Sequence, residues 1–292
     1  MAVVAHPLGL LGPPPAMVDP QAMLGPDTVS ARLLGHPAML LGGPRALLLQ
    51  LADPLVTAGV ADHSDFHEAP FDRLLRTLSA MGTIAFADPE TSARALRAVA
   101  ATHERVRGRA PDGRSYAATD PHLAAWVHAT LVDTALAVER RWLGLLSAAD
   151  RARCYRETLR LAAAFGVPAD ALPPDLGGFE RWFGERLATL EVSQTAREMA
   201  DEILHPPLRQ AWGPAGRAVE LAGWPVLGAV TSDLLPPSLR AAYGVGEPAR
   251  LPRSALAGVS VVARALAPLS TTRLCRPDAP IRLAAALTGA HV

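Results

Sequence analysis

The chain has 292 residues, half of them apolar and 19% charged, so it is long and apolar enough to bury a full core and is not disordered. All 28 basic residues are arginine, and they balance 28 acidic residues. The absence of lysine excludes Schiff-base chemistry and a phosphate-loop lysine, and the absence of asparagine excludes N-glycosylation. Zero net charge argues against nucleic acid as a partner.

The first 30 residues are apolar, but they lack the basic start of a signal peptide and are interrupted by prolines. No uninterrupted apolar run is long enough to predict a membrane-spanning helix. The two cysteines, Cys154 and Cys275, match no disulfide, c-type haem or thiolate zinc spacing. We therefore expect a cytoplasmic protein without stable membrane insertion, in which residues 1–42 form an extended N-terminal arm and lead-in.

Beyond the arm, apolar residues recur at spacings of three and four and strand patterns are almost missing, which predicts an all-α fold. A Leu-rich helix is expected from Pro44 to about residue 59, and Asp53-Pro54 should kink or break it. A turn over residues 61–70 and a helix over 71–86 follow.

Asp88-Pro89 and Asp120-Pro121 both show an aspartate cap followed by a proline at the first helical position. These pairs predict helices from 88 to about 107 and from 120 to about 142, joined by a loop over 108–119. Ser147 should cap the next helix, which runs to residue 165. Further helices are expected over 178–190, 193–204, 215–235, 237–243 and 254–266. One helical domain, 43–266, would precede a C-terminal tail, 267–292.

Two histidines fall on well-patterned helices. His103 occupies the apolar stripe formed by Leu96, Val99 and Val106, and His128 lies at the edge of the stripe of the next helix, facing a cleft beside the core. Each could be an ordinary core histidine bonded to a backbone carbonyl, and for a single histidine that interpretation is the commoner one. No GxSxG, GxGxxG or HExxH signature favours hydrolase or nicotinamide chemistry, and the pair of ExxH motifs that di-iron bundles use is absent.

Other candidate polar residues lie nearby in the sequence. His63 and His67 stand four residues apart in a predicted turn with acidic neighbours, which suits a metal ligand, a proton carrier or a solvated turn equally well. Arg97 and Arg107 belong to a basic run that normally forms a solvated face. Arg107 follows His103 by one helical turn, so it could also point at the same site and bind a carboxylate there.

Several motifs, taken in their order and spacing, resemble the DUF2236 family, the catalytic domain that bacterial rubber oxygenase shares with the fungal oxygenase MpaB. The similarity extends over about residues 43–266. The motifs that carry it are PRALLLQL at 44–51, GVADHS at 59–64, HERVRG at 103–108, GRSY at 113–116, DP at 120–121, WVHATLVD at 126–133, FGVP at 165–168 and LLPPSLR at 234–240.

The resemblance implies a single globin-reminiscent helical domain that encloses a pocket for non-covalent haem b. It implies a histidine-ligated iron, with dioxygen or peroxide as co-substrate and an apolar substrate. His128, within the Trp-Val-His-Ala-Thr segment, is the expected iron ligand. Catalytic or distal roles are expected among His63, His103, Arg97 and Asp53. Arg107, Tyr116 and Trp126 are the further candidates for contacting the cofactor.

The chain departs from this family pattern at one place, because Asp53-Pro54 stands where members commonly have His-Pro. An aspartate there could serve as a general base. Rubber oxygenase resembles a lysine-capped haem protein in its resting state, and this chain has no lysine to form such a cap. A small apolar metabolite is therefore the expected substrate rather than polyisoprene.

Three hypotheses follow from the sequence. The first is a haem b oxygenase or oxidase, the second a haem- or lipophile-binding protein without turnover, and the third a non-haem metal enzyme. The last would use His63, His67, His103 and His128 as ligands. The sequence leaves a homodimer open.

Overall fold

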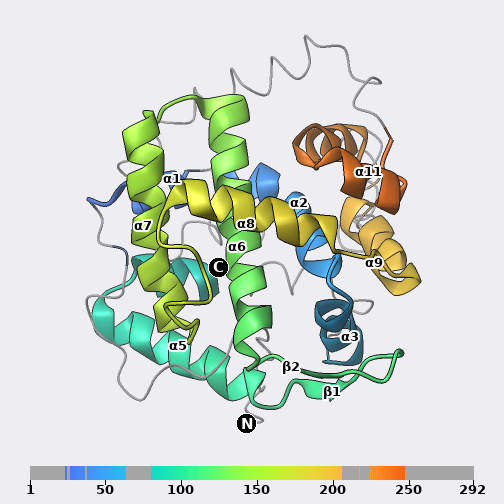
Figure 1. The fold of residues 1–292 in the computed structure, drawn as a ribbon. Helices are drawn as coiled ribbons and strands as arrows, with labels where there is room; N and C mark the ends of the chain where they lie inside the picture. Colours follow the sequence, from blue (N-terminus) through green and yellow to red (C-terminus); the bar gives the residue numbers. More distant parts are fainter. Residues whose placement is uncertain are drawn as a thin grey trace.

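The computed structural model describes residue 24 and residues 27–36, 38–63, 80–205, 217 and 224–246. These residues are predominantly helical, as predicted (Figure 1). Residues 80–86 and 224–234 are also helical. The bounded elements are α1 (Val29–Leu34), α2 (Met39–Leu51), α3 (Pro54–His63), α5 (Pro89–His103), β1 (Arg107–Arg109), β2 (Ser115–Ala117), α6 (Pro121–Val138), a π-helical turn η2 (Glu139–Leu143), α7 (Ala148–Ala164), α8 (Leu176–Ala188), α9 (Gln194–Leu204) and α11 (Pro237–Tyr243).

Helix starts follow the capping signals of the sequence. Asp88, Asp120, Ser147 and Ser193 precede α5, α6, α7 and α9, and each side chain accepts a backbone N–H of its helix's first turn. Such a cap contributes about 1 kcal/mol, because it satisfies a donor that the helix leaves unpaired. The predicted break at Asp53-Pro54 is confirmed, since α2 ends at Leu51 and α3 begins at Pro54.

The N-terminal part of the helical region differs from expectation. Pro44 does not open its helix but lies inside α2, which begins at Met39. Helix α2 packs against α6, and this packing keeps the segment around Pro44 helical although proline cannot donate a backbone hydrogen bond. Helix α1 lies within the segment expected to be an arm and lead-in, and it packs against α7. Residues 1–23, 25–26 and 37 of that arm, the tail over 267–292 and the predicted helix over 254–266 lie outside the described residues.

A small hairpin replaces the end of one predicted helix and part of the predicted loop. Helix α5 ends at His103, and β1 and β2 pair antiparallel with Gly108 opposite Tyr116. A Cβ at position 108 would come 2.5 Å from the Tyr116 hydroxyl oxygen, so glycine lets this ring lie across β1. The turn contains Gly113 with φ of 88°, a conformation that glycine adopts readily.

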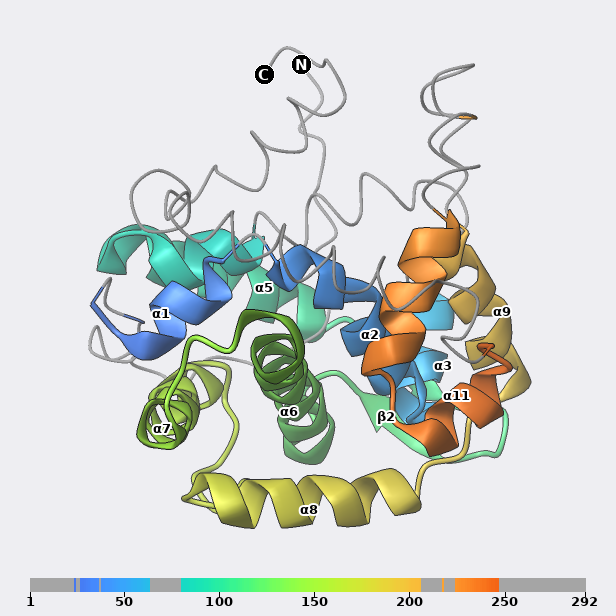
Figure 2. The ribbon, with the colours of Figure 1, turned by 90° about the horizontal axis from the view of Figure 1, so that it is seen from above.

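Helix α6 is the central element and is buried on nearly all sides. It lies between α8 on one side and α5 on the other, while α2 and α3 flank it (Figures 1 and 2). Helix α2 approaches α6 closely at Gly42, where an added Cβ would come 2.7 Å from Thr134 Cγ2 and 2.9 Å from Val138 Cγ2. Side chains on all faces of α6 therefore reach the interior.

A buried arginine joins α2 to α6. Arg45 pairs with Asp133 at 2.5 Å, and it also donates to Thr134 Oγ1 at 2.6 Å and to the Leu234 carbonyl at 2.8 Å. Its side chain is 5% exposed, so the hydrogen bonds compensate a charge that water hardly reaches. This group fixes the register between the two helices.

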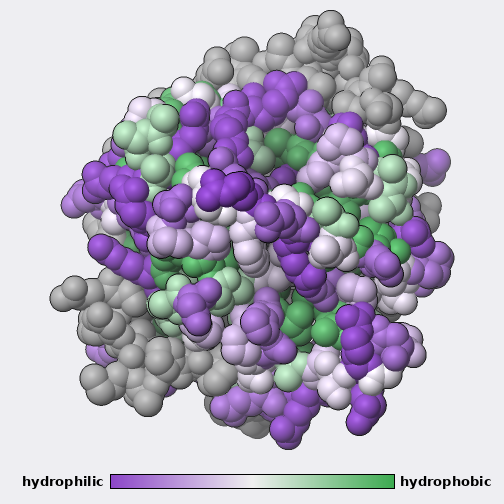
Figure 3. Space-filling view, in the orientation of Figure 1, coloured by the Kyte–Doolittle hydropathy of each residue, from purple (hydrophilic) through white to green (hydrophobic). Residues whose placement is uncertain are grey.

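The face covered by α8 is largely hydrophilic, with exposed apolar residues in small separate groups (Figure 3). Within the part of the chain described, no helix has the length and apolar character needed to cross a bilayer.

Candidate functional site

His128 lies in the second turn of α6 beyond its Asp120 cap. The Asp120 carboxylate accepts the backbone N–H of His122 at 2.7 Å, which fixes the start of the helix and hence the position of His128 on it. The residue is only 4% exposed, and its Nε2 atom has no hydrogen-bond partner among the described residues. Burial lowers the pKa of His128 to about 4, so the imidazole is neutral at pH 7.

His103 is a second buried imidazole, at the C-terminal end of α5. It is fully buried, and within the described structure neither ring nitrogen has a hydrogen-bond partner. Burial lowers its pKa to about 3. It shares the buried face of α5 with Leu96, Val99 and Ala100, as the apolar stripe predicts.

Helix geometry shows which side of α6 carries His128. Trp126 stacks on Phe183 of α8, with ring centroids 5.3 Å apart, so its face of α6 is turned toward α8. Two residues further on, His128 is rotated by roughly 160° about the helix axis. His128 therefore projects from the opposite side of α6, where Figure 2 shows α5. Both unpartnered imidazoles belong to this α5 side of α6.

An apolar cavity of about 20 Å³ lies between α3, the hairpin and α6. Ala124 of its wall is one helical turn before His128 and on nearly the same side of α6. Among the described residues, its lining contains no charged side chain. The lining residues are Leu55, Val56, Gly59, Val106, Tyr116, Ala117, Ala118, Leu123, Ala124 and Val127.

Polar groups gather at the rim of this cavity. The Tyr116 hydroxyl donates to Asp62 Oδ2, and burial followed by this contact raises the pKa of Tyr116 to about 12. His63 Nε2 lies 3.3 Å from the Arg107 carbonyl, and the His63 ring meets Tyr116 edge-on with centroids 6.1 Å apart. The structure thus brings His63, Tyr116 and Arg107 together, with His63 and Arg107 exposed and the Tyr116 ring buried.

Asp53 is not part of the cavity lining, and its carboxylate oxygens already have partners. Its Oδ1 accepts the backbone N–H of Leu55 at 2.8 Å, which caps α3, and its Oδ2 pairs with Arg186 of α8 at 2.5 Å. The guanidinium of Arg186 also lies over the Trp126 ring, 5.7 Å from its centroid. Asp53 therefore joins α3 to α8 in this structure, and both its oxygens are engaged.

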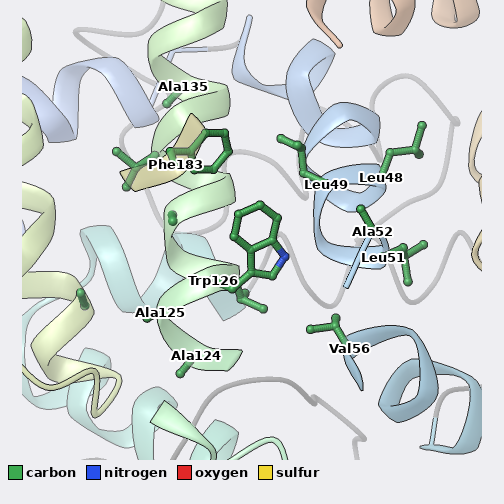
Figure 4. Close-up of a cluster of buried hydrophobic side chains, with 14 of the residues drawn as sticks. Leu48, Leu49, Leu51, Ala52, Val56, Ala124, Ala125, Trp126, Ala135 and Phe183 are labelled. Atoms are coloured by element: carbon green, nitrogen blue, oxygen red, sulfur yellow. The ribbon is translucent and has the colours of Figure 1, made fainter. Parts of the chain in front are cut away.

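The remaining two sequence candidates differ in burial. Trp126 is 1% exposed, and within the described structure its Nε1 has no partner. Figure 4 shows its indole between α6 and the junction of α2 and α3, with the nitrogen on the side of Ala52. Arg97 is exposed on α5, off the buried face that carries His103. The structure does not bring Arg97 into the buried layer.

Sequence reasoning missed Asp62 and Arg186 as partners of Tyr116 and Asp53. No spacing signal predicts the Asp53–Arg186 pair, because its members lie 133 residues apart. The hairpin that carries Tyr116 did have a signal, because Pro111-Asp112-Gly113 is a typical turn sequence.

The non-haem ligand set of four histidines finds no support in the described residues. His67 lies outside them, His63 is exposed at the rim, and His103 and His128 are buried. Among described residues, no three His, Cys, Asp or Glu side chains are grouped as a metal site.

Comparison with known families agrees with the motifs. The family model described as "ER-bound oxygenase mpaB/B'/Rubber oxygenase, catalytic domain" matches residues 31–267. The chain belongs to this family. It is therefore an oxygenase-type catalytic domain, an enzyme of the oxidoreductase class.

Two mycobacterial proteins are also similar to the chain. An uncharacterised protein of Mycobacterium bovis and one of Mycobacterium tuberculosis are each 31% identical to it over 178 residues, which is 58% of this chain and 69% of theirs. No solved structure matches the chain.

Proposed function

We propose that this chain is a haem b-dependent oxygenase that acts on a small, mostly apolar substrate with dioxygen or peroxide. The observation that carries the proposal is the His128 imidazole, which is buried, neutral and unpartnered at Nε2 among the described residues. A buried polar atom without a partner costs about 1–3 kcal/mol, so a site that keeps one is suited to a ligand. A neutral imidazole nitrogen is the group that binds haem iron in globins and peroxidases.

The His128 imidazole is a suitable ligand for haem iron, whereas the apolar cavity is too small for the porphyrin ring. At about 20 Å³, the cavity admits a single small molecule. We place the iron ligand on the α5 side of α6, where His128 projects, and assign no other geometry to the cofactor. When bound, haem would supply the oxidising chemistry, and the protein would choose the substrate and exclude water.

The other residues of the site have supporting roles in this proposal. His103 is neutral and buried on the same side of α6, so either of its ring nitrogens could accept or donate one hydrogen bond to a bound group. Arg107 lies at the exposed rim beside His63, where it could pair with a carboxylate without burying a charge.

The absorption spectrum and a pyridine haemochromogen assay test the cofactor and its ligand. We expect near-stoichiometric haem b in the purified protein and loss or shift of its bands in His128→Ala. The matched control is His122→Ala, because His122 lies on the same helix but is exposed. A colourless protein after expression with ample haem precursor contradicts the haem assignment, and an unchanged spectrum in His128→Ala contradicts the ligand assignment.

Turnover needs a separate measurement. Oxygen consumption with a panel of small apolar substrates should exceed the rate without substrate, and it should fall to that background in His128→Ala. A haem-loaded protein that consumes no oxygen with any substrate would indicate a binding protein instead. Iron without porphyrin in the purified protein would favour the non-haem enzyme.

A further inference from the structure

The apolar cavity beside α6 has the properties of a gas site. Its volume of about 20 Å³ suits a single small molecule, and its wall is made of aliphatic side chains, backbone and the Tyr116 ring. The cavity is partly open to its surroundings, but its apolar wall offers water few hydrogen-bond partners, so a small apolar molecule such as xenon can compete with water there. Dioxygen is a molecule of that size and polarity.

The hydroxyl of Tyr116 does not make the cavity polar. Its hydrogen is donated to Asp62 on α3, and this contact holds the hairpin against α3 while the ring forms part of the wall. The Asp62 carboxylate and the exposed His63 ring therefore remain at the rim of the cavity. A polar molecule inside would lose its hydrogen bonds to water without replacing them.

The cavity is adjacent to the residue on which the proposed function depends. Ala124 of its wall is four residues before His128, a spacing that places two Cβ atoms about 5–6 Å apart on a helix. Long side chains on a helix lean back over the preceding turn, so the His128 imidazole is directed toward the turn that contains Ala124. The turn of α6 that contains Ala124 therefore borders both the cavity and the imidazole.

We propose that this cavity is a docking site for dioxygen on its way to the haem side of His128. The inference rests on the proposed function for the use of the gas, but binding of an apolar gas to the cavity does not depend on haem. Gly59, in the middle of α3, contributes no side chain to the cavity wall. The space that the methyl group of an alanine would fill is therefore free.

The structure offers a matched pair of variants to test this site. In Gly59→Ala the added Cβ would lie 3.6 Å from the Tyr116 ring and 3.7 Å from Val106 Cγ1, which are ordinary contacts, so the methyl group fits and occupies cavity space. In Gly184→Ala, on α8, the added Cβ meets nothing within 4 Å. Both substitutions raise helix propensity in the same way, but only the first fills the cavity.

Xenon binding to the protein as purified is the first measurement. Methyl NMR spectra under xenon pressure should show shifts at Leu55, Val106 and Val127, with affinity about tenfold weaker in Gly59→Ala and unchanged in Gly184→Ala. Absence of these shifts in the wild type, or equal affinity in Gly59→Ala, would overturn the gas site whether or not the protein binds haem.

The second measurement uses the haem-loaded protein and addresses dioxygen itself. The KM for dioxygen should rise several-fold in Gly59→Ala, with kcat and the haem spectrum unchanged. A variant that loses xenon binding but keeps the wild-type KM would overturn the role in dioxygen delivery. Absence of haem would contradict the proposed function alone and would leave the xenon result standing.

Discussion

The charged side chains buried where α2, α3 and α8 meet α6 are paired, whereas the two imidazoles on the α5 side of α6 lack partners among the described residues. Arg45 contacts Asp133 and Thr134, and Asp53 contacts Arg186 and the start of α3. His103 and His128 are as deeply buried. Burial alone therefore does not explain the difference. The paired side holds helices together, and the unpaired side retains free nitrogens at a cost in stability.

Breaking the Arg45 group should give the largest effect. Arg45→Leu would leave the mostly buried Asp133 carboxylate without its partner, and we expect the free energy of unfolding to fall by about 4 kcal/mol. Urea denaturation measures this change, and Arg97→Leu on the exposed face of α5 serves as a control with little expected effect. A loss of less than 1 kcal/mol would mean that the paired side does not hold the fold.

The unpartnered imidazoles should make the stability of the protein depend on pH. Burial lowers the pKa of His103 from 6.5 to about 3, so protonation favours the unfolded chain. The stability tied to His103 is complete above pH 6.5 and is lost progressively as the pH falls toward 3. At pH 4.5 we expect the loss to be about 3 kcal/mol.

His103→Leu isolates this contribution, since leucine does not titrate. Urea denaturation of the haem-free protein at several values between pH 7 and 4.5 should show a shallower pH dependence in His103→Leu than in the wild type. Parallel curves for the two proteins would show that His103 finds a partner in solution, and the contrast between the two sides of α6 would then disappear.

Asp53 offers the smallest and most graded test. Asp53→Ala removes both the cap of α3 and the pair with Arg186, and we expect it to cost about 2 kcal/mol. Asp53→Asn keeps a capping oxygen and should cost about half as much. Thermal or urea denaturation of both variants checks this order. A loss of oxygenase activity in variants that remain folded under the assay conditions would instead support Asp53 as a general base.

The local parts of the fold were predictable because their signals are local. Each Asp-Pro pair and the capping serine act on their own first turn, so Asp88, Asp120 and Ser147 located three helix starts correctly. The start of α2 was wrong because contacts with α6, which lies far away in sequence, override Pro44. The hairpin was missed because its strands are three residues each, too short for an alternating pattern.

The site was predictable only in part. The apolar periodicity of α5 correctly placed His103 in the core, and His128 proved more buried than a position at the edge of a stripe suggests, because α6 is covered on nearly every side. The partners of Asp53 and Tyr116 required the tertiary structure. Whether His128 binds iron stays a prediction.

Gly42 sets a limit on how this enzyme can be changed in the laboratory. Because any side chain there would overlap Thr134 and Val138, a mutant library that varies α2 should leave this position fixed. Gly59 tolerates a methyl group in ordinary contact, so variation at the cavity wall need not disturb the junction of α2 and α6. Directed evolution of substrate or gas access should therefore begin on α3 and the hairpin, where new shapes can be tried without loosening the central helix.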